Sequence, residues 1–457
     1  MKLRFALMLL IDALLAVAAH CSALAFRFGY TALREQWLSQ KSVQVAVIFV
    51  CAALFSSYLM EVYTLDRRCS RWEIFINCLQ AGGAAFFFLF VVYYLAPSVM
   101  LGRGVLFLSI GFFFIYQVLW HAFSGLAVRA PHFCQRVLIL GTGQLAWRLG
   151  ELIRTGDTQF TLAGYLQCSD ENESEDPPVA PELLVAREAD LLSTARKVGA
   201  WVMVVALSER RGVLPLQEMM QCKLEGIKVI DAPTFYEMVQ EKLMLEEITP
   251  GWIIFSAGFH RSALSKVYKR FIDMVLSLLG LLLSAPFFPL IALAVKLDSP
   301  GPLFFKQVRV GSGEVPFVLY KFRSMSQDAE RNGAVWALKN DVRVTRVGRI
   351  LRDYRIDEIP QLYNVLKGEM SFIGPRPERP EFVESLKKEI YYYSKRHTIK
   401  PGLTGWAQVR YPYGATVEDA VEKLRFDLYY IKNVSFLLDS QIIFETMKVV
   451  LLGKGGR

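Results

Sequence analysis

The chain has 457 residues, which is enough for about three domains. Hydrophobic residues make up 53% of the chain and charged residues 21%, a balance that excludes an ordinary water-soluble protein. The formal net charge of +9 favours anionic lipid headgroups and phosphorylated substrates as partners. No recognition motif for nucleic acid accompanies this charge, so we expect no nucleic acid partner. The seven cysteines include no Cys-x-x-Cys pair and support neither a disulfide framework nor a zinc site.

Residues 1–128 predict a four-helix transmembrane bundle, because four apolar runs are each close to the length of about 20 residues that spans a bilayer. The runs are Phe5–Phe26, Val43–Leu65, Ile74–Ala96 and Val105–Val128. The loop between the second and third runs carries Arg67, Arg68 and Arg71, which favours a cytoplasmic position for both termini of the bundle. Asp12 and His20 lie inside the first run. We expect them to make hydrogen bonds between helices; a polar path through the membrane is the alternative.

Residues 129–250 predict a Rossmann-like α/β domain. The segment Gln135–Ala146 is typical of a strand, a Gly-rich turn and a helix, with Gly141, Gly143 and Ala146 at the G-x-G-x-x-G/A positions. Three further apolar runs alternate with helical stretches and predict the other strands of a parallel sheet: Leu162–Gln167, Trp201–Leu207 and Ile227–Ile230. The domain contains no Tyr-x-x-x-Lys pair. We therefore expect a structural or regulatory role; a bound nucleotide is the alternative.

A linker at 251–265 leads into a fifth apolar run, Phe271–Leu297, which lies within a C-terminal domain of residues 266–457. Pro286 and Pro289 interrupt the middle of this run, and proline breaks the hydrogen-bond ladder of a helix. Both flanks are basic, so both prefer the cytoplasmic side. The pattern predicts a re-entrant helix hairpin at 271–297 that enters the membrane and returns; a kinked transmembrane helix is the alternative.

The adjacent carboxylates Asp357 and Glu358 are the main candidate for a catalytic centre. Five arginines at intervals of three precede them, which predicts a basic stripe along a helix: Arg343, Arg346, Arg349, Arg352 and Arg355. Pro360 is tolerated only in the first turn of a helix, so a helix beginning near Asp357 and ending at Gly368 is expected. Arginines bind phosphate oxygens, while one carboxylate can bind Mg²⁺ and the other can attack phosphorus. The alternative is a solvated, salt-bridged helix.

From Lys269 to the C-terminus the chain resembles the bacterial monotopic phosphoglycosyl transferases, the sugar transferases that begin exopolysaccharide and O-antigen synthesis. The resemblance rests on six motifs in order: KRFIDMVLS, KLDSPGPLFFKQVRVG, KFRSM, NDVRVTRVGRILR, DEIPQLYNVLKGEMSFIGPRP and KPGLTGWAQVR. The bundle and α/β domain ahead of them resemble the large members of that family. The implied architecture is a membrane α plus α/β protein, with an α/β catalytic domain that carries the re-entrant hairpin.

The resemblance implies a transfer in two steps. Asp357 attacks the β-phosphorus of a UDP-sugar and releases UMP, and undecaprenyl phosphate then takes the sugar phosphate from the carboxylate. Glu358 is expected to hold Mg²⁺, and Asp357 is an equal candidate for the metal. The implied location is the bacterial inner membrane, with the catalytic domain on the cytoplasmic side and the bilayer and a second copy of the chain as further partners. The identity of the sugar stays open.

Charge and position suggest the remaining substrate contacts. Arg352 and Arg376 are expected on phosphate oxygens. Lys321 and Arg323 are candidates for the nucleotide or lipid phosphate, with a buried ion pair as the alternative, and Arg410 is a further candidate. The stretch from Val417 onwards mixes apolar and charged residues at helical spacing; it is expected at the membrane interface or at a partner, with core packing as the alternative.

Two other functions fit part of the sequence. A membrane-anchored nucleotide-sugar dehydratase or epimerase would use the α/β domain, but the missing Tyr-x-x-x-Lys pair argues against it. A non-catalytic scaffold for polysaccharide assembly would not require the Asp357–Glu358 pair and its arginines.

Overall fold

The computed structural model describes residues 2–37, 40–60, 62–63, 71–129, 135–156, 160–167, 183–187, 190–207, 214–259, 262–326, 341, 343–411, 414 and 416–451. Arg67, Arg68 and the end of the second apolar run, for which the sequence made predictions, lie outside these residues. The chain divides into two compact units, Met1–Ala232 and Pro233–Arg457.

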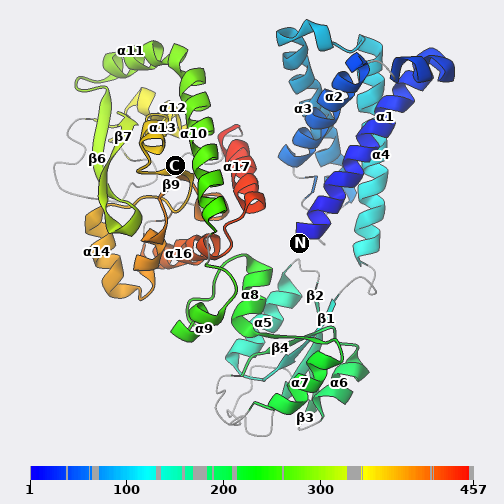
Figure 1. Ribbon diagram of the computed structural model, residues 1–457, viewed down its shortest axis with the longest axis vertical. Coiled ribbons are helices and arrows are strands. Elements are labelled where there is room, and N and C mark those ends of the chain that lie inside the picture. The colour runs from blue at the N-terminus through cyan, green and yellow to red at the C-terminus, as the bar shows by residue number, and fades with distance from the viewer. Residues whose placement is uncertain are drawn as a thin grey trace. The chain divides into compact units, whose positions relative to one another are not determined.

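The N-terminal apolar runs form the helices of a membrane bundle, blue to cyan in Figure 1. These helices are α1 (Lys2–Trp37), α2 (Gln40–Leu59), α3 (Arg71–Leu95) and α4 (Arg103–Arg129), with a 3₁₀ turn at η1 (Pro97–Val99). Leu7–Gly29, Ile74–Leu95 and Arg103–Phe123 are long and apolar enough to span a membrane, whereas Val43–Leu59 is shorter than predicted. The small residues Ala16, Ala19 and Ala23 pack near Phe49 and Phe113, because small side chains let membrane helices approach closely.

Asp12 makes hydrogen bonds between helices, as the sequence predicted. Its buried carboxylate accepts a 2.7 Å hydrogen bond from Nε2 of Gln117 on α4, and Nε2 of His121 lies 3.2 Å away. His20 on the same helix is 3.2 Å from the hydroxyl of Ser109, also on α4. These contacts give the polar groups of α1 partners inside an apolar bundle.

A parallel α/β domain follows the bundle, as predicted. Its strands are β1 (Gln135–Leu140), β2 (Phe160–Gln167), β3 (Leu184–Arg187), β4 (Val202–Val205) and β5 (Lys228–Asp231), in the spatial order β3-β2-β1-β4-β5. Its helices are α5 (Gln144–Thr155), α6 (Leu191–Val198) and α7 (Leu216–Leu224). The turn between β1 and α5 places Gly141 at φ 121°, a conformation that favours glycine. The order of the strands is that of doubly wound sheets.

The C-terminal unit combines short strands with helices. Its first elements are α8 (Ala232–Gln240), α9 (Pro250–Phe255), α10 (Ala263–Ser284), η4 (Ala285–Phe287), α11 (Phe288–Asp298), the antiparallel pair β6 (Phe304–Val310) and β7 (Pro316–Phe322) joined through η5 (Ser312–Glu314), and α12 (Arg346–Asp353). The later elements are η6 (Ile356–Glu358), α13 (Gln361–Lys367), β8 (Ser371–Ile373), α14 (Pro380–Glu389), η7 (Tyr393–Thr398), β9 (Gly402–Thr404), α15 (Trp406–Arg410), α16 (Val417–Lys432) and α17 (Phe436–Leu451).

Residues 233–250, which the sequence assigned to the α/β domain, pack with the C-terminal unit. Leu243 and Ile248 belong to the same hydrophobic core as Trp406 and Tyr430. Nε1 of Trp406 also donates a 2.9 Å hydrogen bond to the backbone oxygen of Glu241. The boundary between the two compact units therefore lies after Ala232.

The fifth apolar run is a broken helix, as its prolines predicted. Helix α10 ends at Ser284, η4 carries Pro286, and α11 leaves at an angle to α10 (Figure 1). The two helices expose many apolar side chains, among them Leu278, Leu282, Leu290 and Leu293. Such a surface is unfavourable in water and is expected against lipid.

Hydrogen bonds connect both helices of this pair to the rest of the C-terminal unit. At the start of α10, Arg270 donates to the backbone oxygens of Val365 and Leu366 at 2.7 and 2.6 Å. Farther along, the buried carboxylate of Asp273 accepts from Ser371 Oγ at 3.0 Å. At the far end, Arg323 donates to the backbone oxygens of residues 295, 299 and 300.

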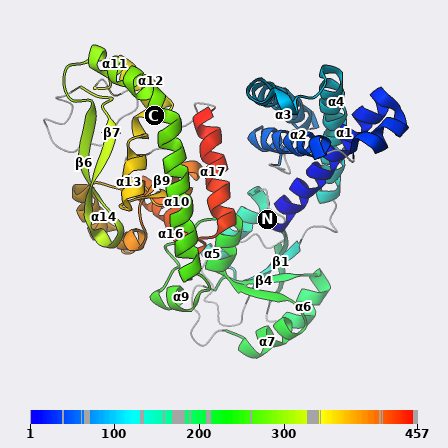
Figure 2. The ribbon, with the colours of Figure 1, turned by 45° about the horizontal axis from the view of Figure 1, so that its top comes forward.

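The stretch from Val417 onwards divides into two roles. The C-terminal half of helix α16 is buried on all sides, including Leu424, Leu428 and Tyr430, so its main role is core packing and not the membrane interface. Helix α17 lies beside α10 in Figures 1 and 2, joined by the ion pair of Lys269 with Asp439 at 3.0 Å. It exposes apolar side chains such as Leu437, so α17 keeps a surface suited to an interface.

Candidate active site

The two carboxylates lie in a tight turn between α12 and α13. Asp357 and Glu358 belong to the 3₁₀ turn η6, and α13 begins at Gln361 directly after Pro360. Gly368 ends α13 in the left-handed conformation at φ 90°, as the sequence predicted. The regular helix therefore begins a turn later than expected, which leaves both carboxylates just ahead of it.

The predicted arginine stripe is interrupted. Arg346, Arg349 and Arg352 share α12, but Arg355 lies beyond its end at φ 55°. This left-handed residue is unusual for a side chain larger than glycine, and such strain is common at functional sites. The turn directs Arg355 toward the carboxylate that follows, with its NH1 3.6 Å from Oε2 of Glu358.

Glu358 is held by three cations. Its side chain belongs to a residue only 7% exposed, and Oε1 lies 2.9 Å from Nζ of Lys321 and 3.0 Å from NH2 of Arg376. Burial acts to raise the pKa of Glu358, but Lys321, Arg376 and Arg355 outweigh burial, so this pKa lies below its usual range. Glu358 therefore remains an anion throughout the physiological range and fixes the surrounding cations.

Asp357 has a different environment. The residue is 6% exposed, and in the part of the chain that the structure describes its carboxylate has one ion pair, at 4.0 Å from Nζ of Lys321. Burial raises the pKa of Asp357; Lys321 and Arg352 act in the opposite direction. A buried carboxylate that is not occupied by strong donors can form a bond to an electrophile.

Lys321 reaches the carboxylates because its strand, β7, is hydrogen-bonded to α13. The side chain of Asn364 on α13 accepts from the backbone N of Tyr320 at 3.2 Å and donates to the backbone oxygen of Val318 at 2.7 Å. This fully buried amide bridges α13 and β7, which carries Lys321. The sequence gave Lys321 two alternatives, a phosphate contact or a buried ion pair, and the structure shows the ion pair with Glu358.

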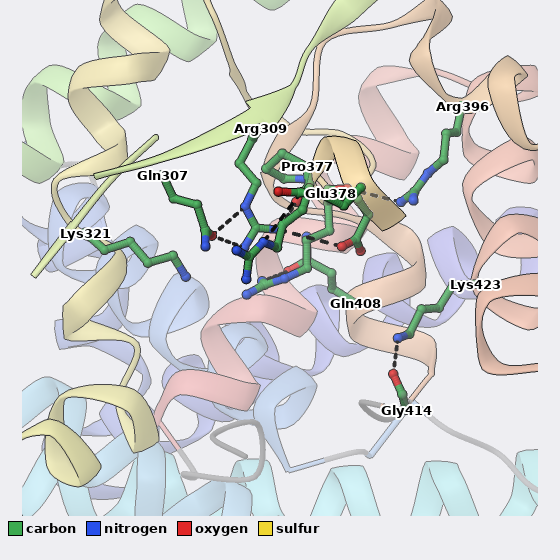
Figure 3. Close-up of polar contacts among 12 residues, drawn as sticks. Gln307, Arg309, Lys321, Pro377, Glu378, Arg396, Gln408, Gly414 and Lys423 are labelled. Carbon is green, nitrogen blue, oxygen red and sulfur yellow. Dashed lines mark hydrogen bonds and ion pairs between the residues drawn. The ribbon is translucent and has the colours of Figure 1, made fainter. Parts of the chain in front are cut away.

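Gln408 is a component that the sequence did not single out. Its Oε1 accepts from NH1 of Arg376 at 3.1 Å and from NH1 of Arg355 at 3.4 Å. Figure 3 shows Gln408 beside the segment of Pro377 and Glu378. One neutral acceptor thus orients two guanidinium groups that also contact Glu358. The signal in the sequence is the GWAQVR motif, where Gln408 lies two residues before the arginine that was selected.

Arg352 lies near Asp357 without an ion pair among the described residues; its charge lowers the pKa of that carboxylate. Arg323 is 6% exposed, and its guanidinium donates to the carbonyls that end α11. Arg410 pairs with Glu241 and lies over the ring of Trp406. These contacts are structural and do not support the substrate-binding roles predicted for Arg323 and Arg410.

The carboxylate pair offers limited ligands for a metal. The described residues contain no group of three or more His, Cys, Asp or Glu side chains that could hold an ion. Mg²⁺ is commonly bound by one or two carboxylates together with substrate phosphates and water, so a small donor set is sufficient. Asp357 fits this role better than Glu358, whose oxygens already contact Lys321, Arg355 and Arg376.

Comparison with known proteins places the C-terminal unit in context. Residues 264–453 match the family model described as bacterial sugar transferase. An exopolysaccharide production protein of Rhizobium leguminosarum bv. phaseoli is 45% identical over 199 residues, which cover 41% of this chain and 98% of that protein.

Longer relatives are similar as well. A UDP-N-acetylgalactosamine-undecaprenyl-phosphate N-acetylgalactosaminephosphotransferase of Aeromonas hydrophila is 48% identical over 189 residues, 41% of this chain and 45% of the relative. An undecaprenyl-phosphate glucose phosphotransferase of Komagataeibacter xylinus is 34% identical over 334 residues, 69% of this chain and 58% of the relative. The chain therefore spans about half the length of these two relatives.

Proposed function

Because the chain belongs to the bacterial sugar transferase family, we propose that it transfers a sugar 1-phosphate from a UDP-sugar to undecaprenyl phosphate and releases UMP. The names of the relatives support undecaprenyl phosphate as the acceptor and a nucleotide sugar as the donor. The observation that carries the proposal is the division of labour between two adjacent buried carboxylates. Glu358 is occupied by Lys321, Arg355 and Arg376, and Asp357 is left available.

In the first step a carboxylate oxygen of Asp357 forms a bond to the β-phosphorus of the donor. The bond from that phosphorus to the oxygen that bridges the α-phosphate breaks, and its electron pair leaves with UMP. In the second step a phosphate oxygen of undecaprenyl phosphate attacks the same phosphorus. The bond to Asp357 breaks, and the carboxylate is restored. Two anionic substrates thus react in turn with one side chain and not directly with each other.

The cations around Glu358 suit this chemistry. Lys321 and Arg376 contact Glu358 and face the same carboxylate pair, so their charges can compensate the negative charge that two phosphate-bearing substrates bring to the site. Asp357 would be the main protein ligand for Mg²⁺, together with oxygens of the donor, and the ion would neutralise phosphate charge when bound. Arg352 stands near enough to Asp357 to add to this field.

We assign the helix pair α10–α11 to a re-entrant membrane hairpin. Its apolar surface is exposed, while Arg270 of α10 donates to the backbone of α13, and Arg323, which follows β7, donates to the backbone at the end of α11. This arrangement supports entry and exit of the chain on one side of the membrane. The catalytic domain then lies at the cytoplasmic face of the inner membrane, where both a nucleotide sugar and a membrane phosphate reach it. The Rossmann-like domain serves a structural or regulatory role.

The proposal is tested by Asp357→Asn, with Asp353→Asn as the matched control on the exposed side of α12. Asp357→Asn should abolish UMP release from UDP-sugars and should retain no label from a donor labelled in the β-phosphate. The control should do both like the wild type. Normal UMP release by Asp357→Asn, or no label on the wild-type protein when acceptor lipid is withheld, would overturn the mechanism.

A further inference from the structure

The segment ahead of the family match packs against the helix that carries Gln408. This segment, residues 233–259, is called the leading segment below; the match itself begins at residue 264. Leu243 and Ile248 of the leading segment lie in the same hydrophobic core as Trp406. Trp406 begins α15, a helix of 5 residues that has Gln408 in its middle. So short a helix has little stability of its own, and its orientation depends on contacts from outside.

Glu241 of the leading segment contacts both ends of α15. Its backbone oxygen accepts a 2.9 Å hydrogen bond from Nε1 of Trp406, and its carboxylate accepts a hydrogen bond from NH2 of Arg410. The guanidinium of Arg410 also lies 4.4 Å from the centre of the Trp406 ring. The Glu241 side chain is only 12% exposed, so the ion pair is partly shielded from solvent.

The backbone of Glu241 has an unusual conformation. Its φ of 53° lies in the left-handed region, which is unfavourable for a residue with a side chain and persists where the surroundings impose it. Its backbone N still donates a 3.0 Å hydrogen bond to the oxygen of Glu237 on α8. In this conformation both the backbone oxygen and the carboxylate of Glu241 reach α15.

Gln408 connects α15 with the carboxylate turn. Its Oε1 accepts from Arg376 and Arg355, which both contact Glu358. Its Nε2 atom is buried and has no hydrogen-bond partner among the residues that the structure describes. The other side of the amide therefore does not hold the side chain in place, and the position of Gln408 depends on the placement of α15.

We propose that Glu241 is a positioning residue for the reaction, because it fixes α15 and so places Gln408 against Arg376 and Arg355. The inference rests on the proposed function and extends it to a residue ahead of the family match. Glu241 acts through Gln408 and not on the substrate. If its ion pair only stabilised the fold, the effect of losing it would not depend on Gln408.

A double-mutant cycle on the full-length protein separates positioning from stability. Glu241→Gln keeps the backbone oxygen and the side-chain shape but removes the charge that pairs with Arg410. It should lower kcat/KM for UMP release about threefold to tenfold, the loss expected for one hydrogen bond at a partly buried site. In a Gln408→Leu background the same change should have no further effect. The donor is whichever of UDP-glucose and UDP-N-acetylgalactosamine the wild-type protein turns over.

Glu237→Gln is the matched control. Glu237 lies one turn before Glu241 and pairs with Lys432, which belongs to α16 and not to α15. Its side chain is 9% exposed, so this change should lower the melting temperature at least as much as Glu241→Gln does. Any effect of the control on kcat/KM should be equal with and without Gln408.

The other outcomes decide against the proposal. An unchanged kcat/KM in Glu241→Gln, or a loss of equal size in both backgrounds, would overturn the positioning role. So would a loss in Glu237→Gln that disappears with Gln408→Leu, since that would indicate a general loosening of the fold. Arg410→Gln breaks the same pair from the other side and repeats the test if Glu241→Gln does not fold. Failure of the wild-type protein to release UMP from either donor would instead remove the proposed function, and the positioning role with it.

Discussion

Gln408 accepts a 3.1 Å hydrogen bond from Arg376, the arginine that also pairs with Glu358. The same oxygen of Gln408 accepts from Arg355. Gln408 carries no charge, so it orients the guanidinium groups without neutralising them. Their positive charge stays available to a phosphate, which a carboxylate at the same position would reduce.

Replacing Gln408 with leucine should therefore weaken catalysis more than folding. Loss of two partly buried hydrogen bonds costs about 1 kcal/mol each, so kcat/KM for UMP release should fall roughly tenfold to thirtyfold. The melting temperature should change by only a few degrees. Steady-state kinetics and thermal unfolding measure the two effects. A large drop in stability with normal kcat/KM would contradict the orienting role.

The pH dependence of UMP release should report Asp357. Burial raises the pKa of Asp357 in the folded protein, and only the carboxylate form attacks phosphorus, so the rate should fall as pH drops through this raised pKa. Glu358, with its lowered pKa, stays ionised over that window. Removing the charge of Arg352 in Arg352→Gln should move the acid limb to higher pH. Arg349→Gln, which is exposed on the same helix, should leave the limb in place. Equal shifts in both variants would argue against a local effect.

Arg323 should matter for stability and not for substrate affinity. Arg323→Met leaves the carbonyls of Pro300, Ser299 and Val295 without their buried donor, which should lower the free energy of unfolding by roughly 2–4 kcal/mol. The KM of the folded fraction for its UDP-sugar should be unchanged. Chemical denaturation and kinetics of the same preparation test this. A higher KM with normal stability would restore the phosphate-binding role that the sequence suggested.

The two ends of the apolar helix pair should lie on one side of the membrane. In a cysteine-free background, Ser265→Cys at the start of α10 and Ser312→Cys in the turn between β6 and β7 should react with a membrane-impermeant thiol reagent from the same side. Spheroplasts and inverted vesicles supply the two sides. Labelling of the two positions from opposite sides would rule out the re-entrant form and favour a kinked span.

The sequence predicted helices and strands correctly where the pattern of apolar residues indicated which side chains are buried. The strands β1, β2, β4 and β5 and the broken apolar helix were all predicted, because apolar runs, glycines and prolines act locally. The short strand β3 was missed, since Leu184–Arg187 is too brief to show a pattern. The carboxylate pair and the ending of α13 at Gly368 were found from local signals of the same kind.

The sequence did not predict which groups the charged side chains contact. Arg323, Arg376 and Arg410 look alike in the sequence, yet one binds helix carbonyls, one binds Glu358 and one binds Glu241. Which arginine meets which acceptor depends on residues that are far apart in the chain. Gln408 was missed for the same reason, and its neutral side chain does not stand out in a search for charged residues.

The hydrogen bonds of Arg270 and Arg323 link the apolar helix pair to the carboxylate turn. Arg270 donates hydrogen bonds to backbone oxygens at the end of α13. Arg323, which directly follows the strand of Lys321, donates to backbone oxygens at the end of α11. These contacts join the proposed re-entrant hairpin directly to the turn that carries the two carboxylates. In the proposed hairpin, the depth of α10 and α11 in the bilayer would set the height of Asp357, so a thicker or thinner bilayer should shift the reaction relative to the headgroup layer.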